Sequence, residues 1–155
     1  MKIAIGADHA GYELKEKLKQ RLAKEDSGVH VEDEGTVSTD SVDYPDFARK
    51  VAEKVAGKKV DLGLLVCGSG IGMAIAANKV PGIRAANVGT EIEAQLSREH
   101  NDANVIAIGA RLLDENKAWA IIERFLHTPF AGGRHQKRVD KIAEIERQEL
   151  QAHCK

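Results

Sequence analysis

Short apolar runs alternate with longer segments of helical periodicity along the whole chain, and this alternation is the feature that most constrains the fold. The runs are Ile3-Ala4-Ile5, Val29 to Val31, Leu62 to Val66, Ile83 to Val88 and Val105 to Ile108. Such runs are typical of strands buried on both faces of a parallel sheet. Between them, apolar residues recur with a helical period. The pattern predicts an α/β fold: a Rossmann-like, three-layer α/β/α sandwich with a five-stranded parallel sheet and right-handed crossovers.

Length indicates a single domain over residues 1–155 with an ordinary apolar core. One further helix, at about residues 133–150, follows the helix of the fifth strand and is surplus to the sandwich. Its apolar positions include Val139, Ile142 and Ile145. We expect this helix to pack on a partner subunit.

Charge and cysteine content exclude several classes of protein. The formal net charge is −1, from 23 basic and 24 acidic residues, so neither nucleic acid nor a membrane is an expected partner. Cys67 and Cys154 cannot build a disulfide framework, and no histidine–cysteine cluster has zinc spacing, so no metal is expected. The apolar start is too short for a signal peptide, and no apolar run approaches about 18 residues. We therefore expect a soluble, cytoplasmic protein.

The loops after the first two strands would lie at the carboxyl edge of the sheet, where open parallel sheets bind ligands. Residues 6–11 place Asp8 and His9 there; they do not form a G-x-G-x-x-G motif, so a dinucleotide is not expected. The alternative is a capping aspartate and an exposed histidine. Residues 35–45 form a long polar loop, a kind that tends to be functional. Within it, Asp43 could instead cap a helix starting at Asp46.

The third strand ends in Cys67-Gly68-Ser69-Gly70-Ile71-Gly72 and continues into an apolar helix at residues 71–78. Glycines at alternate positions allow a sharp turn that brings several N–H groups toward one ligand. A helix start adds positive partial charge, so this turn suits a phosphate or a developing oxyanion. A thiol placed there has its thiolate form favoured. The alternative is that Cys67 is a small buried apolar residue at a strand end.

Two further segments carry candidate residues. Arg134 and Arg138 share one face at the start of the last helix, where cations oppose the helix dipole unless an anion compensates them. Arginine suits phosphate, and Arg111, just past the fifth strand, could join them; the alternative is a solvated basic face. His100 is a candidate acid or base. It precedes the fifth strand, at the edge away from its own Cys67, so it is either a capping residue or serves a neighbouring subunit.

Several of these blocks together resemble the type B ribose-5-phosphate isomerases, which share a family with the galactose-6-phosphate isomerase subunits. The resemblance covers residues 2 to about 147. The blocks are Asp8-His9-Ala10-Gly11, Asp43-Tyr44-Pro45, Cys67 to Gly72, Ala76-Ala77-Asn78-Lys79, Ser97 to Asp102 and Gly132-Gly133-Arg134-His135.

The resemblance implies a sugar-phosphate isomerase domain without metal or cofactor, in a homodimer or dimer of dimers with active sites between subunits. It implies that Cys67 is the base, that His100 opens the sugar ring and that Ser69 handles hydroxyl oxygens. It assigns phosphate binding to His9, Arg111, Arg134 and Arg138. The sugar and enediolate positions it implies are Asp8, Asp43, Tyr44, Gly68, Gly70, Ile71, Gly72 and Asn101.

Some members of that family lack this cysteine and carry a glutamate in the following helix. Here Cys67 is present and the helix position is Met73, so the chain is similar to the cysteine branch. Two alternatives remain: an isomerase of galactose or allose 6-phosphate, and a non-catalytic phosphate or nucleotide binder. A binder would not need a thiol at the glycine turn.

Overall fold

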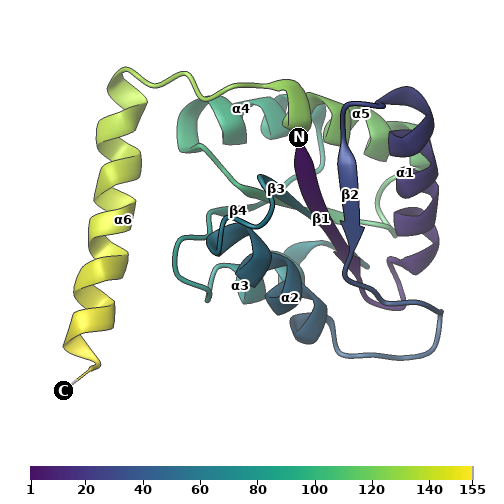
Figure 1. Cartoon of the computed structure of the whole chain (residues 1–155), viewed down its shortest axis with the longest axis horizontal. Helices are drawn as coiled ribbons and strands as arrows, with labels where there is room; N and C mark the ends of the chain where they lie inside the picture. Colours follow the sequence, from purple (N-terminus) through teal and green to yellow (C-terminus); the bar gives the residue numbers. More distant parts are fainter. Residues whose placement is uncertain (155) are drawn as a thin grey trace.

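The computed structural model describes residues 1–154 and alternates strands with helices, as the apolar pattern predicts (Figure 1). The strands are β1 (Lys2–Ala7), β2 (His30–Asp33), β3 (Leu62–Cys67), β4 (Ala85–Asn87) and β5 (Val105–Gly109). The helices are α1 (Tyr12–Glu25), α2 (Tyr44–Ala56), α3 (Ile71–Ala77), α4 (Glu91–Asn101), α5 (Glu115–His127) and α6 (Arg134–Ala152).

All pairings in the sheet are parallel, in the order β2-β1-β3-β5-β4. The sheet has a core on each face. On one face, α1, α4 and α5 pack against alternate strand residues such as Ile5, Leu64 and Ile106. On the other face, α2 and α3 cover Leu65 and Ala107. The predicted three-layer sandwich with a five-stranded parallel sheet is confirmed.

Two predicted boundaries were wrong. The fourth strand is only Ala85–Asn87, because the backbone N–H of Arg84 donates to Asn104 Oδ1 (2.8 Å) instead of joining the ladder. Helix α2 begins at Tyr44 rather than Asp46, since Pro45 is tolerated in a first helical turn that lacks N–H partners. Asp43 occupies the capping position of α2, but its side chain makes no capping hydrogen bond.

An ion pair with a buried ammonium and a partly exposed carboxylate fastens β2 to α1. The ammonium of Lys15 is fully buried and lies 2.8 and 2.7 Å from the two carboxylate oxygens of Asp33. Asp33 Oδ1 also accepts the N–H of Gly35 at 2.8 Å. Beyond it, Ala7 N–H donates to Gly35 O (2.6 Å) and Thr36 N–H donates to Ala7 O (2.7 Å). The chain leaving β2 is thus held beside the end of β1.

Helix α6 stands to one side of the sandwich and contacts it mainly through α4 (Figure 1). Gly82 N–H donates to Glu146 Oε2 at 2.9 Å, which ties the middle of α6 to the turn before β4. Ile142 and Ile145 are 46% and 62% exposed, and Ile75 of α3 is 59% exposed. These three apolar side chains are therefore largely uncovered in the described chain, and the packing of α6 on a partner stays a prediction.

Among residues 1–154, no helix combines the length and the apolar character that crossing a bilayer requires.

Candidate active site

The glycine turn after β3 forms around the cysteine sulfur. Gly70 has φ +81°, a left-handed conformation that glycine adopts without steric cost. This conformation directs the Gly70 N–H to Cys67 Sγ, 3.1 Å away. The N–H of Ile71 donates to Ser69 Oγ at 3.2 Å. The turn therefore gathers a thiol, a hydroxyl and backbone donors at the carboxyl end of the central strand.

Cys67 has features of both a buried core residue and a polar residue of the glycine turn. The residue is 4% exposed and packs in the core beneath α2 and α3, as a small apolar residue at a strand end would. Its sulfur nevertheless accepts a hydrogen bond from the turn above it, so the polar end of the side chain faces that turn.

Two side chains from other elements lie against the turn. The Arg111 guanidinium lies against Gly68, where an added Cβ would come within 2.9 Å of Nη1. The Tyr44 ring covers Gly72, where an added Cβ would lie 2.7 Å from two ring carbons. Arg111 follows the end of β5, and Tyr44 is the first residue of α2. The structure thus places Arg111 and Tyr44 beside the cysteine turn, as the ligand-edge argument predicts.

The loop after β1 contributes Asp8 and His9 to the same edge. Asp8 is 7% exposed, and its Oδ1 accepts the Gly11 N–H at 3.0 Å. The residue that caps α1 is Gly11, so Asp8 supports the turn but is not the cap itself. His9 is half-buried rather than exposed, and its Nδ1 accepts the N–H of Val42 at 3.2 Å.

A second group of predicted residues gathers where α4 ends and α6 begins. The His100 ring stacks on the His135 ring with centroids 4.2 Å apart and planes 13° from parallel. The N–H of Ala131 donates to Glu99 O at 3.1 Å and holds the two helix ends together. Asn101 follows His100 in the sequence, is the last residue of α4 and is exposed.

Positive charge is concentrated in this second group. The first turn of α6 contains no acidic residue, and neither Arg134 nor Arg138 joins an ion pair within the described chain. Burial, followed by the positive charges of His100 and the two arginines, lowers the pKa of His135. The second group therefore has uncompensated positive charge of the kind that an anion would relieve.

The two groups lie at opposite ends of the sheet. Cys67 ends β3, and Asp8 and Arg111 follow the carboxyl ends of β1 and β5. His100, in contrast, precedes the amino end of β5. In Figure 1, α4 and the start of α6 lie toward the N-terminal end of β1, away from the end at which β1 finishes. One chain alone does not bring the predicted site residues together.

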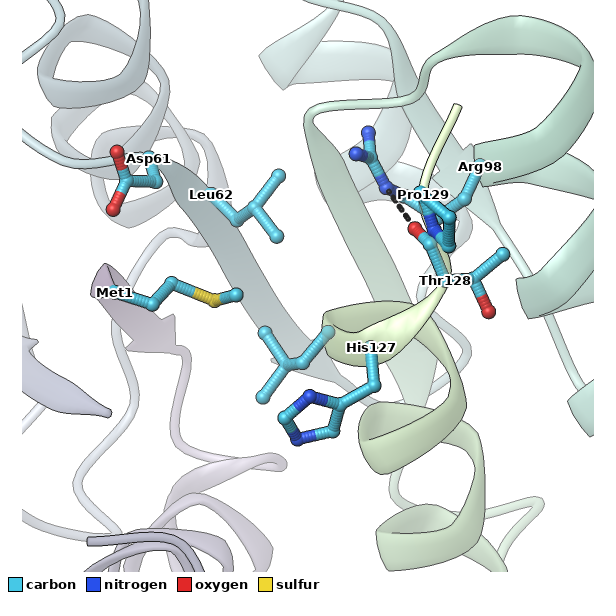
Figure 2. Close-up of a pocket in the computed structure, with 8 residues that line it drawn as sticks. Met1, Asp61, Leu62, Arg98, His127, Thr128 and Pro129 are labelled. Atoms are coloured by element: carbon cyan, nitrogen blue, oxygen red, sulfur yellow. Dashed lines mark hydrogen bonds between the residues drawn. The ribbon is translucent and has the colours of Figure 1, made fainter. Parts of the chain in front are cut away.

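A cavity of about 590 Å³ lies elsewhere, at the amino ends of β1 and β3 (Figure 2). Its walls include Met1, Asp61 and Leu62. The guanidinium of Arg98 in its wall donates to Thr128 O at 3.2 Å. None of the predicted site residues lines this cavity, so it is separate from both groups.

The sequence interpretation missed three contributions to these groups. Asn87 donates through Nδ2 to Ser69 O (3.3 Å) and to Ala107 O (3.1 Å), which fastens the glycine turn to β5. A polar residue next to the end of the apolar run at residues 83–88 was a usable signal for Asn87. His135 and the backbone of Val42 act through contacts distant in sequence, and no local pattern indicates them.

Comparison with known proteins identifies the family. The Ribose/Galactose Isomerase family model matches residues 3–142. Ribose-5-phosphate isomerase B of Escherichia coli (strain K12) is 48% identical over 145 residues, covering 94% of this chain and 96% of that protein. Ribose-5-P isomerase B of Listeria innocua is 42% identical over 146 residues, covering 94% and 97%.

Solved structures agree with this assignment. Clostridium thermocellum ribose-5-phosphate isomerase B superposes with a TM-score of 0.93 at 50% identity and covers 96% of this chain and 99% of its own. Ribose-5-phosphate isomerase B from Mycoplasma genitalium, solved with bound ribulose-5-phosphate, gives a TM-score of 0.90 at 42% identity, with 94% and 96% covered. With a family model spanning most of its length and relatives of this similarity, the chain belongs to the ribose/galactose isomerase family and is an isomerase.

Proposed function

We propose that this isomerase interconverts ribose 5-phosphate and ribulose 5-phosphate through an enediolate, using side chains and backbone donors without a metal. The observation that carries the proposal is the placement of Cys67 Sγ under the Gly70 N–H, with the Arg111 guanidinium against Gly68. A base, anion-stabilising donors and a phosphate ligand then share one edge of the sheet. The relatives named as ribose-5-phosphate isomerases support this substrate.

In the proposed reaction, the Cys67 thiolate takes the proton from C2 of the open-chain aldose. The C2–H electron pair forms the C1–C2 double bond, and the carbonyl oxygen on C1 gains the negative charge. The Gly70 and Ile71 N–H groups already donate to Cys67 Sγ and Ser69 Oγ, so the remaining N–H groups of the 68–72 turn would stabilise the charge as it develops. Ser69 relays the proton between O1 and O2, and the thiol returns its proton to C1. Atoms and charge balance without a cofactor.

The proposed phosphate site uses basic side chains from both ends of the fold. His9 and Arg111 lie at the cysteine edge, and Arg134 and Arg138 of the partner subunit approach it from the start of α6. The unpaired positive charge around those two arginines supports this assignment, because a planar guanidinium binds phosphate oxygens in pairs. Asp8, Asp43 and Tyr44, with Asn101 of the partner, would hold the sugar hydroxyls.

The proposed assembly is a homodimer, alone or paired again, whose sites each need both chains. His100 and Cys67 lie at opposite ends of one chain, so His100 can protonate a ring oxygen near Cys67 only from a neighbour. The exposed apolar residues of α3 and α6, among them Ile75 and Ile145, supply a surface for that neighbour. A two-fold axis would build two equivalent sites.

The test is ketose formation by the purified protein from ribose 5-phosphate, with galactose 6-phosphate and allose 6-phosphate in parallel. We expect turnover with the pentose phosphate and much less with the hexose phosphates. Cys67→Ala should lower kcat by at least about 10²-fold, the lower contribution of a positioned acid–base group. Cys154 is the second cysteine and is exposed, so Cys154→Ala is the matched control and should leave kcat unchanged. Preference for a hexose phosphate would overturn the substrate, and near-normal turnover of Cys67→Ala would overturn the base.

A further inference from the structure

The hydrogen bond between Val42 and His9 constrains the chemistry of an imidazole at the proposed phosphate site. Val42 N–H lies 3.2 Å from His9 Nδ1 and meets the geometry of a hydrogen bond. A backbone amide always donates, so Nδ1 must present its lone pair. The neutral ring then carries its proton on Nε2. The other ring nitrogen is thereby left as a donor.

The position of Val42 is fixed by the structure on either side of it. Upstream, the paired backbone hydrogen bonds between residues 35–36 and Ala7 hold the loop against the end of β1. The Lys15–Asp33 pair fixes the same point through Gly35 N–H. Downstream, α2 begins only two residues later, at Tyr44. The segment that carries Val42 is therefore anchored at Thr36, six residues upstream, and at Tyr44, two residues downstream.

We propose that Val42 is a positioning residue whose backbone N–H holds His9 as the Nε2–H tautomer, so that neutral His9 donates one hydrogen bond to a phosphate oxygen. The tautomer assignment stands on the hydrogen bond alone, whereas the phosphate contact rests on the proposed function. In water the two neutral tautomers interconvert freely. A tautomer that is already fixed removes the free-energy cost of selecting it when the anion binds, which is the usual benefit of preorganisation.

Under this proposal the basic side chains of the site have different roles. Arg111 and the two arginines of the α6 start carry permanent charge, whereas His9 would contribute direction through a single N–H. Loss of the Val42 donor should therefore weaken phosphate binding without changing the chemistry at Cys67. It should raise KM and leave kcat close to the wild-type value.

The first test reads the tautomer directly in the unmodified protein. Two-bond ¹⁵N–¹H correlation spectra of ¹⁵N-histidine-labelled protein distinguish the protonated from the bare ring nitrogen, and His9→Gln identifies the His9 signals by their absence. At mildly alkaline pH we expect His9 to show a bare Nδ1 and a protonated Nε2. A proton on Nδ1, or a tautomer mixture like that of a histidine exposed to solvent, would overturn the assignment. This measurement requires no activity, so it stands or falls independently of the proposed function.

The second test removes the donor. Val42→Pro deletes the N–H, and Val42→Ala keeps it while shortening the side chain, so the alanine variant is the matched control. We expect Val42→Pro to show mixed tautomers and to bind inorganic phosphate and ribose 5-phosphate roughly 2- to 10-fold more weakly, the range of one neutral hydrogen bond. Val42→Ala should match the wild type in both respects.

Unchanged phosphate affinity in a folded Val42→Pro variant would overturn the positioning role. Equal weakening in both variants would also overturn it, because the side chain rather than the N–H would then be responsible. Circular dichroism and the melting temperature establish whether Val42→Pro is folded. If it is not, the tautomer spectrum of the wild type still decides the assignment.

Discussion

Asp33→Asn tests the ion pair that holds β2 and the following loop in place. Lys15 Nζ is fully buried, and its partners are both carboxylate oxygens of Asp33 at 2.7–2.8 Å and Glu16 Oε1 at 3.0 Å. An asparagine removes the charge and leaves a buried ammonium with one half-exposed carboxylate. Breaking a buried pair from one side costs about 3–5 kcal/mol. Because Glu16 remains, we expect the free energy of unfolding to fall by about 3 kcal/mol.

The assay is urea unfolding of wild type and variant at equal protein concentration, since assembly contributes to apparent stability. For a chain of this length the expected loss corresponds to a melting temperature lower by roughly 6–12 °C. Glu16→Gln is the matched control. It leaves the Lys15–Asp33 contacts intact and should cost under about 1 kcal/mol. The double variant Lys15→Met/Asp33→Asn should recover part of the loss, because no buried charge is then left unpaired.

Acid titration gives an independent readout of the same pair. Burial alone would raise the pKa of Asp33, but hydrogen bonds from Lys15, Lys19 and Gly35 N–H outweigh it and lower that pKa. A lowered pKa means that the pair stabilises the fold above the unfolded value of about 3.9 and that this stability is lost as pH falls through the folded value. Asp33→Asn should flatten this acid limb. A loss under about 1 kcal/mol with an unchanged acid limb would refute the reasoning.

Three further predictions concern the two residue groups. Gly72→Ala should raise KM severalfold with little loss of stability, because the new Cβ would lie 2.7 Å from carbons of the half-exposed Tyr44 ring and displace it; steady-state kinetics and a melting curve check this. Arg134→Ala should weaken inhibition by inorganic phosphate about 10- to 100-fold, the range of a charge-assisted hydrogen bond. Arg147→Ala, at an exposed position of α6, is the control and should leave inhibition unchanged; equal effects of the two variants would indicate only a general loss of charge. Burial and then nearby positive charge lower the pKa of His135, so the stability of the fold should decrease as pH drops below the unfolded histidine value of about 6.5. In melting curves, His135→Phe should remove this pH dependence, and an unchanged dependence would contradict the role of His135.

The central strands were predictable because their signal is local. Leu62–Cys67 and Val105–Gly109 are completely buried, so each is an unbroken apolar run in the sequence. The edge strand β4 was less predictable. Ile83 is apolar because it is buried beneath α3, not because it pairs in the sheet. An apolar run in the sequence indicates burial, and where a neighbouring helix covers the chain the buried segment extends beyond the residues that pair in the sheet.

The site was predictable where its residues follow strand ends. Cys67, Asp8 and Arg111 each follow a buried strand, so the topology alone places them on one edge. The partners that orient them were not predictable. Val42 and His9 are 33 residues apart, and His100 stacks on a histidine from a different helix. Such contacts depend on the folded path of loops, which leaves no periodic signal in the sequence.

In the proposed assembly, each active site combines Cys67 of one chain with His100 of its partner. Mixing Cys67→Ala and His100→Ala chains after dissociation and reassociation tests it most directly. Each heterodimer would hold one site intact in both residues and one site carrying both substitutions. By random pairing, activity should recover to at most about a quarter of the wild-type value. If verified heterodimers remain as inactive as their parents, the shared-site account is contradicted.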